Sequence, residues 1–300
     1  MRRQRINLLD KYKSIKRPLI LDGAMGSLLQ QRGINTSNPL WSSIANFTHK
    51  NLVKQIHLEY IKSGAEIITT NTFRTNPLAF EKSDLQISYH DFIKNSISNA
   101  IEAVENKEII IAGSNAPAED CYQKSRTITI DKLEYNHKKH IELLWENGVD
   151  VIWNETQSHW DEIKIICEFC SANNLPFVVN LFFDSELKLL SGEPLIEAIK
   201  FIESYTPVAI GLNCIQYSLI KAFFNENSFN YNWGFYLNCG PDNIDLTVQQ
   251  QITCAVNEKE YLEIIKEYLH LSPIYVGACC GSNPNHIKEI KNYLDELYKH

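Results

Sequence analysis

Short apolar runs alternate with amphipathic stretches along the whole chain. The apolar runs are nearly continuous and rich in β-branched residues, which is typical of strands that are buried on both faces of a sheet. Each stretch between two runs has apolar residues at the three- and four-residue spacing of a helix that packs on one side. The runs predict strands at 18–26, 66–73, 108–117, 150–156, 176–184, 208–214, 233–240 and 274–281.

The amphipathic stretches follow these strands in regular order. They predict helices at 51–65, 91–105, 131–148, 159–174, 194–204, 218–225, 258–271 and 285–298. Eight strand–helix units within 300 residues, with no change of composition between them, fit a (β/α)8 TIM barrel better than an open sheet with helices on both faces. We therefore predict an α/β protein with a single barrel domain that covers residues 1–300.

The composition excludes several other classes of protein. Hydrophobic residues make up 44% of the chain and charged residues 22%, which argues against a disordered chain, collagen or a coiled coil. No apolar run approaches the roughly 20 residues of a membrane span, so we expect no membrane partner. With 36 acidic and 29 basic residues the net charge is −7, which argues against a general nucleic-acid binder.

The N-terminal segment and the eight cysteines bear on the cellular compartment. Segment 1–16 is basic but lacks the continuous apolar stretch of a signal peptide. We therefore expect a cytoplasmic protein. Its cysteines are then expected to be reduced thiols, buried or bound to metal, rather than a disulfide framework.

Polar and thiol side chains recur where the predicted strands end. In a barrel of this kind the carboxyl ends of the strands carry the functional residues. The candidates at these ends are Asp22 with Gly23 and Ala24, Thr72, Glu155, Cys214, Asn238, Cys279 and Cys280. Taken alone, Asp22 could be a turn residue before glycine, and Glu155 a rim carboxylate with a lysine or backbone partner.

Three of these residues are suited to a metal. Cys214 ends the sixth predicted strand, and Cys279 and Cys280 end the eighth, two strands away around the rim. Zinc binds thiolates, and a catalytic zinc keeps three protein ligands and one open position. Adjacent strand residues point to opposite faces, so Cys279 and Cys280 can share a metal only if the backbone turns between their flanking glycines. Packing as small buried hydrophobes is the alternative.

Two other pairs have simpler explanations. Cys167 and Cys170 form a C-x-x-C inside a predicted helix. No strand and turn precede it and no second pair completes a zinc site, so we predict core packing. His137 and His140 lie one helical turn apart, but the lysines between them indicate a solvent-exposed face.

At these positions the sequence resembles the homocysteine S-methyltransferase family. The most specific feature is a Gly-x-Asn-Cys segment at 211–214, followed about 65 residues later by a glycine-flanked Cys-Cys. The matching segments keep the family order and are 22–27, 64–65, 70–73, 155–156, 211–214 and 277–282, with Pro284 and His286. The segment 113–122 and the residue before Asn238, a leucine where the family has proline, depart from the usual pattern.

The resemblance implies a (β/α)8 barrel in which Cys214, Cys279 and Cys280 bind zinc and the homocysteine sulfur takes the fourth position. It implies that Asp22 and Glu155 hold the ammonium group of homocysteine. The remaining residues implied at the substrate are Gly23 and Ala24, whose amides lie near the carboxylate, Thr72, and Asn238, which occupies the fourth zinc position when substrate is absent.

We therefore expect a zinc-dependent enzyme that methylates the thiol of homocysteine to give methionine. The eight units use the whole chain, which leaves no room for a cobalamin or folate module or for the long C-terminal arm of betaine-using members. This favours a sulfonium donor, S-methylmethionine before S-adenosylmethionine, whose charge the rings of Phe73, Trp153 and Tyr236 could hold. Methyl transfer to another thiol or a selenol, and a zinc-holding barrel without catalysis, are the alternatives.

Overall fold

Eight parallel strands form one sheet in the computed structural model, which describes residues 3–105, 107–228, 230–240 and 252–299. The strands lie in the order β1-β8-β7-β6-β5-β4-β3-β2. A parallel bridge between Leu21 and Ile67 joins the two ends of this order, so the sheet closes into a barrel. The strands are β1 (Leu19–Ile20), β2 (Ile67–Thr69), β3 (Ile110–Asn115), β4 (Val151–Gln157), β5 (Phe177–Leu181), β6 (Ala209–Asn213), β7 (Trp233–Leu237) and β8 (Tyr275–Ala278).

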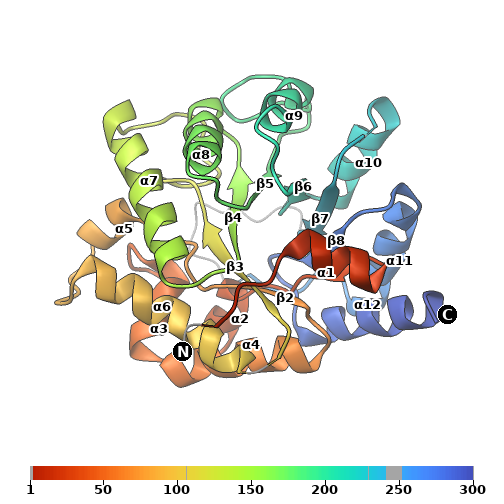
Figure 1. Cartoon of the computed structure of the whole chain (residues 1–300), viewed down its shortest axis with the longest axis horizontal. Helices are drawn as coiled ribbons and strands as arrows, with labels where there is room; N and C mark the ends of the chain where they lie inside the picture. Colours follow the sequence, from red (N-terminus) through yellow and green to blue (C-terminus); the bar gives the residue numbers. More distant parts are fainter. Residues whose placement is uncertain (1–2, 106, 229, 241–251, 300) are drawn as a thin grey trace.

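The helices form a ring around this barrel (Figure 1). The predicted (β/α)8 architecture is confirmed, because each strand leads to at least one helix before the next strand begins. The helices are α1 (Leu8–Ile15), α2 (Gly26–Gln31), α3 (Ala45–Thr48), α4 (Lys50–Lys62), α5 (Pro77–Glu81), α6 (Tyr89–Val104), α7 (Ile130–Glu146), α8 (Trp160–Ala172), α9 (Leu195–Glu203), α10 (Tyr217–Glu226), α11 (Glu258–Tyr268) and α12 (Pro284–Leu297), with 3-10 turns at Trp41–Ile44 and Leu269–Leu271.

Seven of the eight observed strands are shorter than the predicted ones, β4 being the exception, and the sequence pattern missed four helices. Apolar residues continue past the strand ends into turns, so the pattern extended β1, β7 and β8 too far. The missed helices α1, α2, α3 and α5 have between four and eight residues. Such short helices show too few turns for a periodic pattern to emerge.

Alternate strand residues face two different cores. One side chain of each adjacent pair, such as Ile20 or Ile68, packs against the helices, and its neighbour, Leu19 or Ile67, fills the barrel interior. Trp153 belongs to this interior, where its ring centroid lies 4.8 Å from that of Tyr275. The expectation of Trp153 at the rim was therefore wrong, because the β4 pleat turns this residue inward below the strand end.

Helix α1 lies across the amino ends of the strands (Figure 1). Leu8 is buried there against interior residues, and the backbone amide of Ile6 donates to Asp150 just before β4. Arg3 pairs with the same carboxylate at 2.8 Å. This end of the barrel is thus closed by protein. None of the described helices combines the length and the apolar character that a membrane span requires.

The prediction that His137 and His140 face solvent was wrong. Both side chains are fully buried where α7 packs against the barrel, whereas Lys138 and Lys139 between them are partly exposed. Residues three apart share one helix face, so the histidines turn inward together while the lysines do not. Burial lowers the pKa of His140 to about 3, which keeps its ring neutral.

Candidate active site

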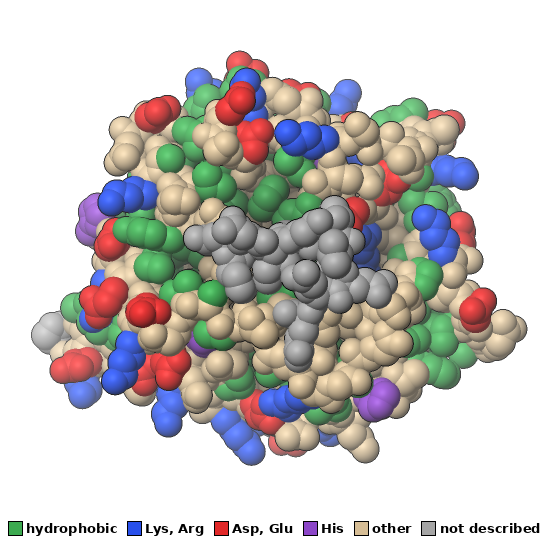
Figure 2. Space-filling model, turned by 180° about the vertical axis from the view of Figure 1, so that it is seen from behind, with side chains coloured by type: hydrophobic (Ala, Val, Ile, Leu, Met, Phe, Trp, Pro, Cys, Tyr) green, Lys and Arg blue, Asp and Glu red, His purple; other side chains and the backbone are tan. Residues whose placement is uncertain are grey.

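A cavity of about 530 Å³ opens among the segments that follow the carboxyl ends of the strands. This volume lies within the roughly 300–1,000 Å³ of small-molecule sites. Figure 2 views the molecule from the side opposite to α1, and basic and acidic side chains are interspersed around the periphery of that face. The lining residues used below are Asp22, Gly23, Ala24, Trp41, Phe73, Arg74, Glu119, Asp120, Tyr122, Glu155, Cys214, Tyr236, Cys279 and Cys280.

The three cysteines converge on this cavity. The sulfurs of Cys214, Cys279 and Cys280 all lie within 4.8 Å of one another. Cys279 and Cys280 come after β8, in a turn that the Ser282 amide closes by donating to the Cys279 carbonyl at 3.1 Å. Because this is a turn and not a strand, adjacent cysteines can point to one place. The condition that the sequence set for a shared metal is thus met.

Gly281 makes this turn possible. Its φ is +82°, a conformation that L side chains rarely adopt. A Cβ atom there would lie 2.7 Å from the backbone nitrogen of Gly240, closer than real Cβ contacts. A larger residue at this position would therefore displace the turn that carries Cys279 and Cys280.

The backbone at Cys214 is held by a partner strand. Cys214 and Thr156, near the end of β4, both have left-handed φ values, +54° and +58°. The Asn213 side chain accepts from the Thr156 amide at 2.8 Å and donates to its hydroxyl at 3.0 Å. Left-handed non-glycine residues persist only where their surroundings enforce them, and they cluster at functional sites. Here the enforced backbone turns the Cys214 thiol toward the other two.

The chemistry of the three thiols fits a soft metal ion. Hydrogen bonds from Cys279 and Cys280 lower the pKa of Cys214, while the bond to Cys214 raises the pKa of both its neighbours. The three thiols alone therefore favour one shared negative charge rather than three thiolates. A divalent cation would stabilise all three, and thiolate sets are preferred by soft or borderline ions such as zinc.

Two buried carboxylates lie on the other walls of the cavity. Thr69, at the end of β2, donates to Asp22 from its amide at 2.9 Å and from its hydroxyl at 3.1 Å. Burial nevertheless raises the pKa of Asp22 well above its usual range. No lysine, arginine or histidine among the described residues pairs with Asp22, so its charge is left for a ligand to balance.

Glu155 is the second of these carboxylates. Ser114 and Tyr236 donate hydrogen bonds to it, the latter at 3.2 Å. Burial raises its pKa to about 7, which these hydroxyl bonds do not offset. Like Asp22, it has no cationic partner in the part of the chain that the structure describes. A ligand with an ammonium group would compensate both carboxylates.

The other residues singled out in the sequence lie in different places. Gly23 and Ala24 line the cavity, but the Ala24 amide already donates to the Ser282 hydroxyl at 3.0 Å. Thr72 is fully buried outside the lining and donates to the Ser114 carbonyl at 2.7 Å. The Asn238 side chain accepts from the Gly240 amide at 2.8 Å and is likewise outside the lining.

Sequence reasoning missed several residues of the cavity, Trp41, Arg74 and Tyr122 among them. The phenol oxygen of Tyr122 lies 3.3 Å from the Cys214 sulfur, and Arg74 lines the cavity five residues after β2. Arg74 directly follows a recognised segment, 70–73, so extending that segment by one residue would have found it. Tyr122 lies in an aperiodic loop, and no local pattern marks it.

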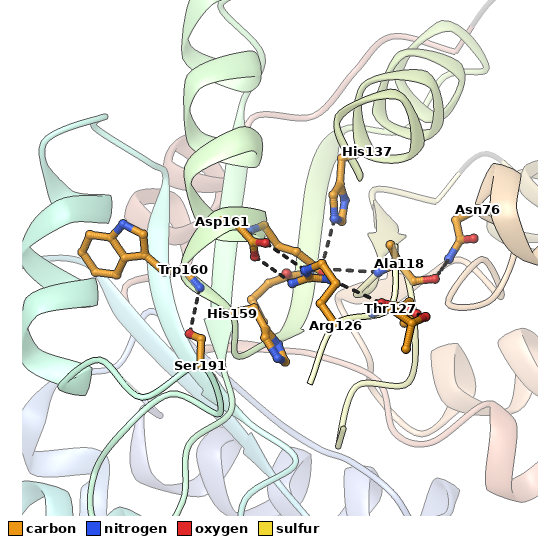
Figure 3. Close-up of polar contacts among 12 residues, drawn as sticks. Asn76, Ala118, Arg126, Thr127, His137, His159, Trp160, Asp161 and Ser191 are labelled. Carbon is orange, nitrogen blue, oxygen red and sulfur yellow. Dashed lines mark hydrogen bonds and ion pairs between the residues drawn. The ribbon is translucent and has the colours of Figure 1, made fainter. Parts of the chain in front are cut away.

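The loop that carries Tyr122 is held by a buried polar cluster between α7 and α8 (Figure 3). Glu162 accepts from the Ala118 amide at 3.3 Å, from Arg126 at 2.6 Å and from His137 at 3.0 Å. Arg126 also forms two bonds with Asp161, at 2.7 and 2.8 Å. One carboxylate thus ties both ends of segment 118–126, which fixes the loop in front of the cysteines.

Comparison with known proteins gives the family. The family model described as homocysteine S-methyltransferase matches residues 19–294, nearly the whole chain. This chain belongs to the homocysteine S-methyltransferase family. The structure is similar to that of the metallated homocysteine methyltransferase MmuM from Escherichia coli, with a TM-score of 0.79 at 22% identity, covering 96% of this chain and 100% of that one.

Curated members of the family are moderately similar to this one. Homocysteine S-methyltransferase of Escherichia coli strain K12 is 29% identical over 69% of this chain and 71% of its own. Homocysteine S-methyltransferase 2 of Arabidopsis thaliana is 23% identical and covers 92% of both chains. Selenocysteine Se-methyltransferase of Brassica oleracea var. italica is also 23% identical, over 92% of this chain and 88% of its own.

The remaining cysteine pair lies far from this chemistry. Cys167 and Cys170 are fully buried on α8 within the main hydrophobic core, which confirms the prediction of core packing. Burial raises the pKa of both thiols well above their usual range. Among the described residues, the three cysteines at the cavity are the group that could hold a metal ion.

Proposed function

We propose that this family member transfers a methyl group from a sulfonium donor to the thiol of homocysteine and so forms methionine. The observation that carries the proposal is the convergence of three thiols and two uncompensated carboxylates on one cavity. The names of the similar proteins from Escherichia coli and Arabidopsis thaliana support the acceptor. They are similar to this chain over most of its length, and this chain brings three thiols and two carboxylates to one cavity.

Asp22 and Glu155 would bind the ammonium group of homocysteine. Both carboxyl groups have raised pKa values because they are buried without a cation. An ammonium ion between them would restore their charged forms and be held in turn by charge-assisted hydrogen bonds. The backbone at Gly23 and Ala24 is placed beside this pair and would receive the substrate carboxylate, the Ala24 amide after release from Ser282.

Cys214, Cys279 and Cys280 would hold zinc, whose soft donor preference these thiols meet. When bound, zinc supplies a thiolate at neutral pH, because coordination removes the proton of a thiol and leaves a nucleophilic sulfur. The chain orients that sulfur by fixing the ammonium end at Asp22 and Glu155. Asn238 would occupy the fourth zinc position when homocysteine is absent. Thr72 would help to position Glu155, because its hydroxyl donates to the Ser114 carbonyl and the Ser114 hydroxyl donates to Glu155.

The reaction balances with a sulfonium donor alone. The homocysteine sulfur forms a bond to the methyl carbon as the bond between that carbon and the donor sulfur breaks. The donor leaves as a neutral thioether, and the thiol proton passes to solvent. Phe73, Trp41 and Tyr236 line the cavity, and their rings can face a sulfonium cation. The cavity must hold both substrates together, which favours the compact S-methylmethionine over S-adenosylmethionine.

A second acceptor class has specific support. The similar Brassica protein is named for methylation of selenocysteine, whose selenol is a softer nucleophile than a thiol. The three thiols of this chain would suit either acceptor. A barrel that binds zinc without catalysis is disfavoured by the intact carboxylates, which such a protein would not need. Small molecules are thus the proposed partners, and the mixed surface charge supports the expectation of no nucleic-acid partner.

Purified protein should contain one zinc per chain and form methionine from homocysteine and S-methylmethionine. Each candidate donor is supplied separately to zinc-loaded protein, and methionine is quantified. S-adenosylmethionine, betaine and methyltetrahydrofolate are the comparison donors, and selenocysteine is the comparison acceptor. Methionine from betaine or methyltetrahydrofolate, with none from either sulfonium, would overturn the proposed donor class.

A further inference from the structure

We propose that Arg74 binds the α-carboxylate of the methyl donor, so that the donor is recognised as an amino acid as well as a sulfonium. This inference rests on the proposed function and specifies which group of the donor, besides the sulfonium, the protein recognises. Arg74 lies in the segment between β2 and α5 and lines the cavity. It therefore faces the space that both substrates must share.

Arg74 differs in its partners from four of the five other arginines in the described chain. Arg3, Arg17, Arg32 and Arg126 each pair with a carboxylate at 2.9 Å or less. Arg74 has no such ion pair among the described residues. Within the described part of the chain, the guanidinium group makes one hydrogen bond, from Nη1 to the Glu119 carbonyl at 2.5 Å. A guanidinium has five donors, so this single bond leaves most of them for a ligand.

Two acidic residues of the lining, Glu119, whose carbonyl Arg74 contacts, and Asp120, accept hydrogen bonds from other groups. The Glu119 carboxylate accepts from the Thr127 amide at 2.9 Å and from its hydroxyl. The Asp120 carboxylate accepts from the Tyr122 amide at 2.9 Å. These hydrogen bonds hold both carboxylate groups against their own loop. The guanidinium charge is thus left for an anionic group that enters the cavity.

The position of Arg74 suits the far end of a donor molecule. In an eight-stranded barrel β2 lies opposite β6, the strand that Cys214 directly follows. A donor must present its methyl group to the sulfur at the cysteines, and its amino-acid end then extends away from them. Arginine binds carboxylates through two parallel hydrogen bonds, which fixes orientation as well as position. S-methylmethionine and S-adenosylmethionine both carry this carboxylate.

The test compares S-methylmethionine with its α-amide, which keeps the sulfonium and the ammonium but lacks the carboxylate. Wild-type protein should use the acid better than the amide by about 10–100-fold in kcat/KM, the value of one charge-assisted pair. Arg74→Gln should use the two donors within about twofold of each other and keep its KM for homocysteine. Arg74→Lys should restore part of the preference, because lysine keeps the positive charge but lacks the two parallel N–H donors of a guanidinium.

Arg32→Gln is the matched control, since Arg32 pairs with Glu59 outside the cavity. It should leave the preference for the acid unchanged. Titration calorimetry of S-methylmethionine onto zinc-loaded protein without homocysteine gives a readout independent of turnover, and affinity should fall in Arg74→Gln alone. Zinc content and thermal midpoint should match wild type in all variants. S-adenosylmethionine and its amide, run in parallel, distinguish the two donors.

The inference is refuted if Arg74→Gln prefers S-methylmethionine over its α-amide in kcat/KM as strongly as wild type does. An equal loss of preference in Arg32→Gln would also refute it. Failure of the proposed function looks different: wild-type protein would then form no methionine from either sulfonium, whatever the state of Arg74. In that case the calorimetric comparison still decides whether Arg74 binds the carboxylate.

Discussion

The cavity rim and the seam between α7 and α8 contain the same kinds of side chain but differ in how these are compensated. Glu155 and Glu162 are seven residues apart; Glu162 is buried, and Glu155 is half-buried at the cavity. Burial opposes ionisation of Glu162, yet His137 and Arg126 outweigh it and lower its pKa. Glu155 has only hydroxyl partners, and burial raises its pKa to about 7. The charge of the Glu155 carboxylate at the rim is thus left for a ligand to balance.

The cysteines of the two regions differ in the same way. Cys167 and Cys170 on α8 belong to the main hydrophobic core and behave as small hydrophobes. Cys214 and Cys280 at the rim lie with their sulfurs 3.5 Å apart, beside a cavity. A buried polar group with its partners inside the protein stabilises a fold, and one without them points to a ligand. Three measurements can break this contrast.

The largest expected effect is on metal binding. Cys→Ser at position 214, 279 or 280 should abolish tight zinc binding and activity, because each change removes one of three ligands. Cys→Ser at both 167 and 170 should lower the thermal midpoint through buried hydroxyls but leave one zinc per chain. Metal analysis after gel filtration checks both. The contrast fails if the double variant loses the metal while the single variants keep it.

The next effect separates the two glutamates. Glu155→Gln should lower kcat/KM for homocysteine by more than about 30-fold, the cost of losing one partner of a desolvated charged pair. Zinc should remain bound. Glu162→Gln should instead destabilise the protein by about 3–5 kcal/mol, since it removes the carboxylate partner of His137 and leaves Arg126 with Asp161 as its nearest carboxylate. Steady-state kinetics and denaturant unfolding measure the two effects. Unchanged kinetics in Glu155→Gln would make Glu155 a structural residue.

The smallest effect is a pH dependence of stability caused by Glu155. Its pKa is raised from 4.5 to about 7 in the folded protein, so folded protein retains a proton that the unfolded chain releases. Stability should therefore fall as the pH rises between about 4.5 and about 7, by up to about 3 kcal/mol. Glu155→Gln should show a smaller fall, because Asp22, whose pKa is also raised, still contributes. The free energy of unfolding is measured against pH for metal-free wild-type protein and metal-free Glu155→Gln. Two profiles that run parallel would contradict the assignment to Glu155.

Much of the fold and part of the site could be predicted from local patterns. Strand and helix periodicity are properties of neighbouring residues, so the order of the eight units was readable in advance. A closed parallel barrel brings all strand ends to one rim, which is why Asp22, Glu155 and Cys214 could be grouped before the structure was known. The strand ends themselves were placed too late, because apolar residues continue into the turns that hold Cys279 and Cys280.

The sequence by itself determined the barrel and the residues at its strand ends, because both follow from spacing along the chain. Only the tertiary structure decided that His137 and His140 are buried and that Tyr122 and Arg74 face the cavity. Segment 118–126 has no periodicity, and its path depends on Glu162, about 40 residues further along the chain. Such contacts depend on how elements pack against one another, which no local pattern records.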